Sequence, residues 1–150
     1  MITLFEKKLT EALQTYQPYK KLKQLLLQKK YPVSVNGPKG SFLPFLISMI
    51  QEQIPGPRLV IVPHEKDAEY LVQDLSLFCD SVRFFPWWNN LPFSGTPVDA
   101  SIAGDRISRL IELIQQKDIT LVASLRSFLT TLPDPEFIQG HFQRIRLVPR

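Results

Sequence analysis

The segment from Asn36 to Pro44 is the place where a nucleotide-binding protein would carry its phosphate loop. It contains two glycines and a lysine, and it lies between a predicted strand and a predicted helix. In a working loop of the form G-x-x-x-x-G-K-[ST], backbone amides surround the phosphates, the lysine neutralises their charge, and the hydroxyl binds Mg²⁺. We call this segment the phosphate-loop position; its relevant residues are Gly37, Lys39, Gly40, Ser41, Phe42, Leu43 and Pro44.

The residues that a phosphate loop needs are missing. Counting from Gly37, the second glycine falls at Phe42, the lysine at Leu43 and the hydroxyl at Pro44. Leu43 supplies no charge, and proline has neither a hydroxyl nor a backbone N–H. We therefore predict no bound ATP, Mg²⁺ or other cofactor, no metal site and no catalytic residue. The alternative is a nucleotide site with an unorthodox loop that uses Lys39.

Other groups with potential chemistry have simpler structural explanations. His64 follows a predicted strand beside Glu65, where a metal or acid–base role is conceivable, but a surface histidine near a helix N-terminus is expected. Asp99, Asp105 and Arg106 share one predicted helix. Helix capping and surface ion pairing explain these three better than catalysis does.

The loop over residues 86–98 is rich in Pro, Trp and Asn. Its aromatic rings could stack on nucleic-acid bases, as such platforms do. However, the chain has no basic residue between Arg83 and Arg106, and nucleic-acid grooves need cations to neutralise phosphates. We therefore expect the aromatic and apolar residues of this region to pack the loop onto a sheet; they are Phe85, Trp88, Leu91 and Phe93.

Short apolar runs alternate with helical patterns from residue 33 onward. This alternation predicts parallel strands joined by helical crossovers, and the continuous apolar character of the runs predicts a sheet covered on both faces. The expected strands are 33–35, 59–62, 82–85, 120–123 and 141–148. The expected helices are 42–51, 65–78 and 99–116, a short turn at 127–132, and two amphipathic helices within 2–30 that are separated near Pro18. The segment Ile54–Pro57 predicts a break.

Charge is concentrated at the two ends of the chain. Residues 1–30 hold seven lysines and two glutamates, and residues 141–150 hold three arginines, whereas residues 31–140 carry a net charge of −4. The lysine-rich end leaves a DNA-binding module open as an alternative. No apolar run is long enough to span a membrane, and there is no signal-peptide pattern. The sequence therefore favours a cytoplasmic α/β domain.

Several segments resemble the UvrB-like region of bacterial transcription-repair coupling factors. The clearest runs from Phe85 to Phe93, F-P-W-W-N-N-L-P-F, and is similar to the family's F-P-x-W-E-x-L-P-Y; its signature residues are Phe85, Pro86, Trp88, Leu91, Pro92 and Phe93, with Arg106 following at the family's spacing. The glycine turn at the phosphate-loop position, the 59–78 region and the 118–125 strand add to the resemblance. Asn89 stands where the family usually has Glu, and Phe93 replaces Tyr.

The resemblance implies a P-loop or RecA-like parallel sheet with flanking helices, preceded by a helical segment. Residues 1–31 would be that helical segment, 32–140 a domain similar to UvrB domain 1a with a degenerate loop, and 141–150 the first strand of an incomplete second domain. The implied role is a non-catalytic scaffold that recruits UvrA and takes part in autoinhibition. Arg144, Arg146 and Arg150 would face the partner. RNA polymerase, DNA, ATP and Mg²⁺ would be bound by other domains of the full-length factor.

Overall fold

The chain consists of two compact units. The computed structural model describes the backbone of residues 2–90, 95, 97–115 and 118–141, and the side chains from Lys7 to Gly140 within these ranges. Unit 1 is Met1–Pro55 and unit 2 is Gly56–Arg150. The division falls within the Ile54–Pro57 segment that the sequence predicts as a break. The domain limits predicted at 31/32 and 140/141 stay predictions.

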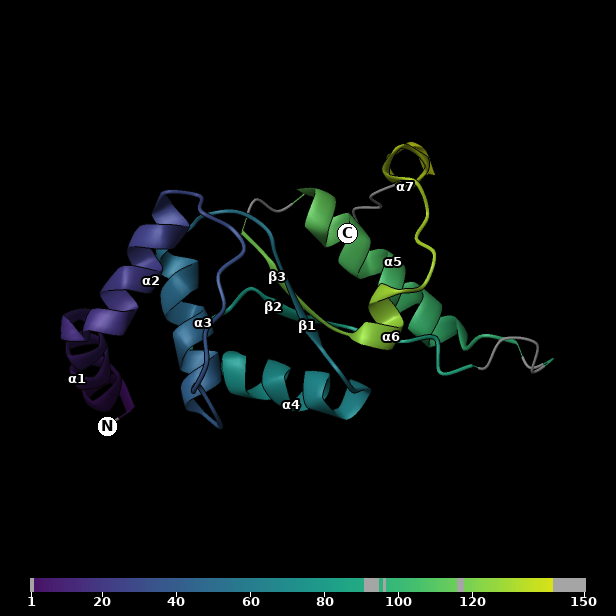
Figure 1. Ribbon diagram of the computed structural model, residues 1–150. Coiled ribbons are helices and arrows are strands. Elements are labelled where there is room, and N and C mark those ends of the chain that lie inside the picture. Colours follow the sequence, from purple (N-terminus) through teal and green to yellow (C-terminus); the bar gives the residue numbers. More distant parts are fainter. Residues whose placement is uncertain (1, 91–94, 96, 116–117, 142–150) are drawn as a thin grey trace, which may run out of the picture. The chain divides into compact units, whose positions relative to one another are not determined.

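Unit 1 contains three helices, α1 (Ile2–Thr15), α2 (Gln17–Leu27) and α3 (Phe42–Gln53) (Figure 1). The two predicted amphipathic helices before residue 30 are therefore confirmed. Pro18 lies in the first turn of α2, where a missing N–H breaks no helical hydrogen bond. The buried apolar side chains of this unit come from all three helices and are Leu13, Tyr19, Leu22, Phe45, Leu46 and Met49.

The strand predicted at 33–35 is wrong. Residues 30–39 have no regular secondary structure, and the peptide bond before Pro32 is cis. Strand propensity reflects packing against a paired neighbour more than an intrinsic preference of the backbone, and this run is short, with Pro32 before it and Gly37 and Pro38 soon after it. The phosphate-loop position therefore precedes a helix but does not follow a strand.

Unit 2 is a mixed α/β structure around a small parallel sheet. Its strands are β1 (Arg58–Val62), β2 (Val82–Phe85) and β3 (Thr120–Ser124), all parallel in the order β1-β3-β2. The intervening and following helices are α4 (Glu65–Leu75), α5 (Ala100–Gln115), α6 (Leu125–Phe128) and α7 (Pro135–His141). The prediction of parallel strands with flanking helices is thus confirmed.

Near the C-terminus, one helix was not predicted, and most of one predicted strand lies outside the described residues. Helix α7 has no counterpart among the predicted elements. The strand predicted at 141–148 begins at His141, which instead ends α7, and residues 142–150 lie outside the described residues.

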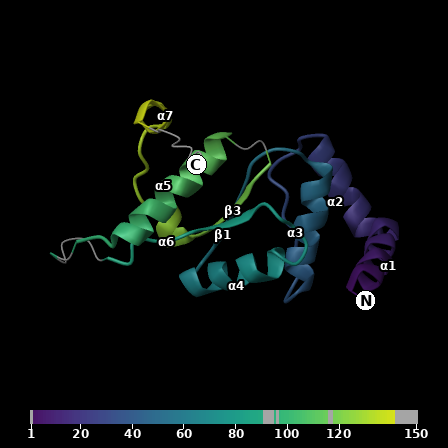
Figure 2. The same ribbon diagram turned by 180° about the vertical axis from the view of Figure 1, so that it is seen from behind.

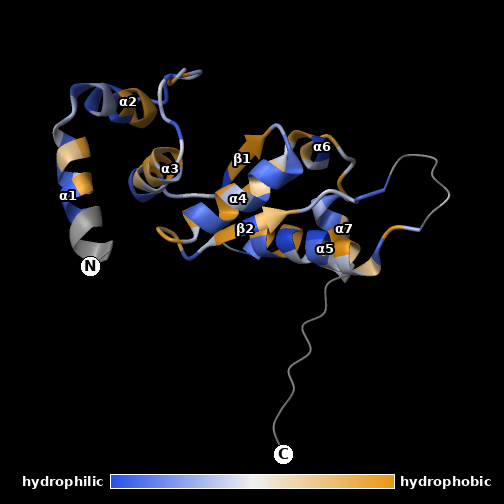
Figure 3. Ribbon diagram, turned by 90° about the horizontal axis from the view of Figure 1, so that it is seen from below, coloured by the Kyte–Doolittle hydropathy of each residue, from blue (hydrophilic) through white to orange (hydrophobic). Residues whose placement is uncertain are grey.

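Strand β3 lies at the centre of the sheet, and all five of its residues are buried. Helix α4 lies on one side of the sheet and α5 on the other (Figures 1 and 2). Phe85, Leu110, Ala123 and Ile138 form a core cluster from β2, α5, β3 and α7. The strands β1 and β2 are largely hydrophobic, whereas α4 and α5 are mixed, as expected for helices with one buried face (Figure 3).

The expectation that every strand is covered on both faces is wrong for β1. Leu59 and Ile61 are 48% and 42% exposed, and burial alternates along this strand. Ile61 is level with Ala123 of β3, and Ala123 with Phe85 of β2, so these three side chains share one face of the sheet. Helix α5 packs over β2 on that face, which leaves Leu59 and Ile61 uncovered.

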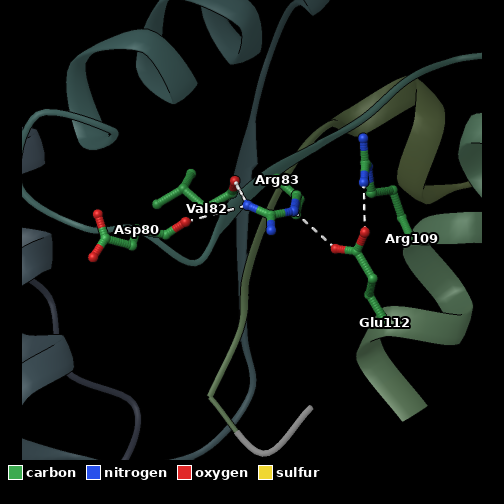
Figure 4. Close-up of polar contacts among 5 residues, drawn as sticks. All are labelled: Asp80, Val82, Arg83, Arg109 and Glu112. Atoms are coloured by element: carbon green, nitrogen blue, oxygen red, sulfur yellow. Dashed lines mark hydrogen bonds and ion pairs between the residues drawn. The ribbon is translucent and has the colours of Figure 1, made fainter. Parts of the chain in front are cut away.

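A chain of ion pairs fixes α5 to β2. Glu112 accepts from Arg83 Nε at 2.8 Å and from Arg109 Nη1 at 2.7 Å (Figure 4). Arg83 Nη1 also donates to the backbone oxygens of Asp80 and Val82. Because the guanidinium of Arg83 is held at both ends, it ties the start of β2 to the middle of α5.

In the described part of the chain, no helix combines the length and apolar character that crossing a membrane requires.

Candidate functional site

The three strands of unit 2 end at the same edge of the sheet. Val62 of β1 pairs with Ser124 of β3, and Phe85 of β2 pairs with Ala123. In open parallel sheets the crevice beyond the carboxyl ends of the strands is the usual ligand site. The residues that follow these strands therefore form the candidate site.

Arg106 lies at this edge and is almost completely buried, with 2% of its surface exposed. Its guanidinium carbon is 4.1 Å from the centre of the Phe85 ring and 4.3 Å from that of Trp88. Nη1 donates to the backbone oxygen of Pro86 at 2.5 Å, and Nη2 donates to Thr130 Oγ1 at 2.7 Å. A planar cation that contacts two ring faces and two acceptors in this way is a strong positioning element.

The hydrogen bonds continue from Thr130 to the end of β3. Thr130 Oγ1 donates to the backbone oxygen of Ser127 at 2.7 Å. Ser124 Oγ accepts from the backbone N–H of Ser127 at 3.1 Å and so caps α6. Ser124 and Ser127 are both fully buried. The Trp-containing loop after β2 is thereby joined, through Arg106, to the segment after β3.

Glu65, the first residue of α4, holds the same loop from the β1 side. Its Oε1 accepts from the backbone N–H of Trp87 at 2.7 Å. Its Oε2 is buried and has no hydrogen-bond partner among the described residues. Burial lowers the pKa of the Arg106 guanidinium, and the negative charge of Glu65 opposes that effect. Arginine remains charged in proteins even so.

We call this set of residues the Arg106 cluster. It joins the segments after all three strands, and its members are Glu65, Phe85, Pro86, Trp87, Trp88, Arg106 and Thr130. The side chains of this cluster therefore contact one another beyond the ends of the strands. The expectation that Phe85 and Trp88 pack the loop onto the sheet agrees with this arrangement.

The outer side of the loop has two further features. Arg126 stacks over the ring of Trp87, with its guanidinium carbon 4.6 Å from the ring centre. Asn89 has φ = 53°, a left-handed conformation in which asparagine is several-fold enriched among non-glycine residues. The backbone conformation thus favours asparagine at this position.

Part of this cluster was not predicted from the sequence. The surface role expected for Arg106 is wrong, because the side chain is buried; Asp99, by contrast, accepts from the backbone N–H of Ser101 and caps α5 as expected. A signal was present: position 106 lies four residues from both Ile102 and Leu110, on the apolar stripe of the helix. No sequence pattern marked Glu65 or Thr130 as partners. The predicted signature residues Leu91, Pro92 and Phe93 lie outside the described residues.

The phosphate-loop position lies in unit 1, separate from this cluster. Gly37 and Gly40 have positive φ values of 112° and 54°, and the side chain of Ser41 caps no backbone N–H of α3. Lys39 is exposed and Pro44 is buried. Pro44 and its neighbour Phe45, both on α3, are buried. The predicted partner-facing Arg144, Arg146 and Arg150 lie outside the described residues.

Metal-binding geometry is absent from the described residues, since no group of three His, Cys, Asp or Glu side chains comes together there. His64 is exposed and precedes α4 without capping it. Glu65, its neighbour, is instead engaged with the backbone of Trp87. The side chains at this edge therefore position a loop, and their chemistry is that of hydrogen bonding and cation–ring stacking.

Unit 2 thus belongs to the class of α/β units with a small parallel sheet, and an arginine–aromatic cluster lies beyond the ends of its strands. No family model matches the chain. Among curated proteins, the chain is similar to the Transcription-repair-coupling factor of Borreliella burgdorferi (strain ATCC 35210 / DSM 4680 / CIP 102532 / B31), with 25% identity over 141 residues. That alignment covers 93% of this chain and 12% of the relative. The resemblance predicted from the sequence is confirmed by this similarity.

Proposed function

We propose that this chain is a non-catalytic scaffold and docking module of a transcription-repair coupling factor. The observation that carries the proposal is the similarity to such a factor over 93% of the chain. Because the chain spans 12% of that relative's length, the activity of a whole factor would depend on other parts of it. The proposed setting is transcription-coupled nucleotide-excision repair in the cytoplasm.

Two features of the described residues support a role without catalysis. Arg106 is buried beyond the end of β2, where it stacks on Trp88, so a ligand at that place would have to displace a buried, hydrogen-bonded cation. At the phosphate-loop position, Leu43 and Pro44 offer neither charge nor hydroxyl. In this proposal unit 2 keeps the architecture of a P-loop or RecA-like domain as a rigid platform, and the chain itself binds no ATP, Mg²⁺ or metal.

The proposed partners follow from the same resemblance. UvrA would be recruited, RNA polymerase and DNA would be engaged through the full-length factor, and contacts with its other domains would contribute to autoinhibition. These contacts would need exposed surfaces, such as the outer faces of α4 and α5. The role of the chain is then to hold such surfaces in a fixed arrangement.

A chimera tests the repair role. The matching segment of the Borreliella factor would be replaced by this chain, and strand-specific repair after ultraviolet irradiation would be measured in cells that lack their own factor. We expect preferential repair of the transcribed strand to be retained. The matched control carries Arg106→Ala in the same chimera and should lose that preference. A folded chimera without any strand preference would overturn the proposal.

Calorimetry separates the scaffold from the nucleotide-binding alternative. We expect no heat of binding when Mg-ATP is titrated into the chain. Micromolar binding that Lys39→Ala abolishes would instead favour a nucleotide site with an unorthodox loop. The variant Lys20→Ala, which removes another exposed lysine of unit 1, controls for loss of charge alone.

A further inference from the structure

Unit 1 contains an open cavity of about 910 Å³, which we call the unit 1 groove. It lies between α1 and α2, the irregular segment after them, and the first turns of α3. Its size is at the upper end of the range for small-molecule and peptide-anchor pockets. The lining comprises Leu13, Tyr16, Pro18, Tyr19, Lys21, Leu22, Leu25, Lys30 to Pro38, Phe42 and Leu46.

The walls of the groove expose aromatic and aliphatic side chains that a folded domain would ordinarily bury. Tyr16 is 58% exposed, Tyr31 61% and Val35 47%. Phe42, at the start of α3, is 38% exposed and packs at 6.4 Å against the buried ring of Phe45. Exposed tyrosines gathered around a hollow are typical of protein-binding surfaces, since a rigid ring buries much area at low entropic cost.

The charged residues of the groove all have the same sign. Lys21 and Lys30 line it, and no Asp or Glu is among the lining residues. Unit 1 as a whole has eight lysines and three glutamates, a net charge of +5. A groove with apolar walls and cations of this kind is complementary to an acidic ligand that also carries apolar anchors.

The irregular segment adds main-chain groups to the lining. The backbones of Ser34 and Val35 take part in no hydrogen bond with the described residues of unit 1. A peptide backbone can bond such groups while its side chains enter pockets. This feature favours a peptide over a rigid small molecule.

We propose that the unit 1 groove binds an acidic peptide segment of a partner protein, one that carries aromatic or aliphatic anchors among its carboxylates. Lys21 and Lys30 contact the carboxylates, and Tyr16, Tyr31 and Phe42 receive the anchors. A nucleic acid fits less well, because two lysines beside apolar walls neutralise few phosphates. The proposal rests on unit 1 alone and does not depend on the repair role.

Selection from a random peptide library displayed on phage tests the proposal on the full chain. We expect enriched peptides to combine Asp or Glu with Phe, Trp, Leu or Ile. Synthetic fluorescein-labelled versions should bind the parent chain, and replacing their carboxylates by amides should weaken binding at least about tenfold. Enrichment of neutral or basic peptides, or no enrichment, would overturn the proposal.

Paired charge reversals locate the binding site. The double variant Lys21→Glu and Lys30→Glu should weaken binding of the acidic peptide at least about tenfold. The control, Lys8→Glu with Lys20→Glu, makes the same change of net charge at exposed lysines outside the groove and should weaken it much less. Equal losses in the two double variants would refute a site in the groove. Circular dichroism establishes that both remain helical.

A labelled DNA duplex distinguishes the remaining class of ligand. We expect DNA to compete poorly with the acidic peptide at physiological salt, and any DNA binding to depend as much on Lys8 and Lys20 as on the groove lysines. Full displacement of the peptide by DNA, with a steep loss of DNA affinity as salt rises, would show that the groove is a nucleic-acid site and would overturn the peptide assignment.

Discussion

The Trp-containing loop after β2 and the phosphate-loop position are both irregular segments that lead into a helix, yet they are held in opposite ways. The loop at Trp87 and Trp88 is fixed by Glu65 on one side and by Arg106 on the other. The phosphate-loop position exposes Lys39 and relies on glycines with positive φ. A motif's position in the sequence therefore does not show how its backbone is held; buried hydrogen bonds and packing do.

The largest expected effect comes from Arg106→Ala. This change leaves the Pro86 oxygen and Thr130 Oγ1 without their donor and opens a void between the rings of Phe85 and Trp88. We expect the unfolding free energy of unit 2 to fall by about 3 kcal/mol. Urea unfolding followed by tryptophan fluorescence measures it, because both tryptophans of the chain lie in unit 2.

The conservative variant Arg106→Lys serves as the control for charge. Lysine keeps the positive charge but lacks the flat guanidinium that stacks on rings and reaches two acceptors. We therefore expect the unfolding free energy of unit 2 to fall, but by less than in Arg106→Ala. An Ala variant as stable as the parent would show that the cluster does not fix the loop.

Removing the charge of Glu65 should have a smaller effect. Glu65→Gln retains an acceptor for the Trp87 N–H, but it removes the negative charge near Arg106 and places an amide donor where Oε2 has no partner. We expect the unfolding free energy of unit 2 to fall by about 1 to 2 kcal/mol. Glu69→Gln, an exposed position on the same helix, should change the unfolding free energy by less than about 0.5 kcal/mol. Equal effects at the two positions would contradict the role given to Glu65.

At the phosphate-loop position, we expect a glycine substitution to act through the backbone. A Cβ at Gly37 would meet no atom within 4 Å, but φ is +112°, so Gly37→Ala should destabilise unit 1 by about 1 kcal/mol. Gly104→Ala, inside α5 and equally open, should instead stabilise unit 2 by up to about 1 kcal/mol. Hydrogen exchange measured by mass spectrometry resolves the two units. If both variants changed stability in the same direction, this account would be contradicted.

The smallest expected effect on stability comes from Asp118, an exposed residue that precedes β3 in the sequence. Its carboxylate accepts from the Gly56 N–H at 2.9 Å and from Arg58 at 3.1 Å. The Gly56 hydrogen bond and then that of Arg58 hold the pKa of Asp118 below its ordinary value of 3.8. A lowered folded-state pKa means that this stabilisation is complete above the ordinary pKa and is lost as pH falls through the lowered pKa.

The pH dependence of the urea midpoint checks this prediction. The midpoint of the parent chain should fall with acidification in that range, and Asp118→Asn should make the slope shallower. Because the pair is exposed, added salt should reduce the difference between the two proteins. An unchanged slope in the Asp118→Asn variant would show that Asp118 does not contribute to the pH dependence of stability.

The sequence predicted the elements of unit 2 well because strong local signals delimit them. Pro57 and Pro63 flank β1, Pro86 follows β2, and Asp99 caps α5. The strand predicted at Val33–Val35 was wrong because a strand also needs a partner strand, which three β-branched or small residues do not specify. The Arg106 cluster was only half predicted. The aromatic packing follows from residue types, whereas the bonds of Glu65 with Trp87 and of Thr130 with Arg106 depend on how the segments after different strands converge.

The uncovered face of β1 has a practical consequence for handling the protein. Among the described residues of unit 2, β1 is an edge strand whose outer hydrogen-bonding groups face no further strand of the sheet, and Leu59 and Ile61 add apolar surface beside them. Such an edge is a template for aggregation between copies. Pro57 and Pro63 limit the template to the five residues between Arg58 and Val62. We expect Ile61→Lys to raise the concentration at which the isolated chain begins to precipitate.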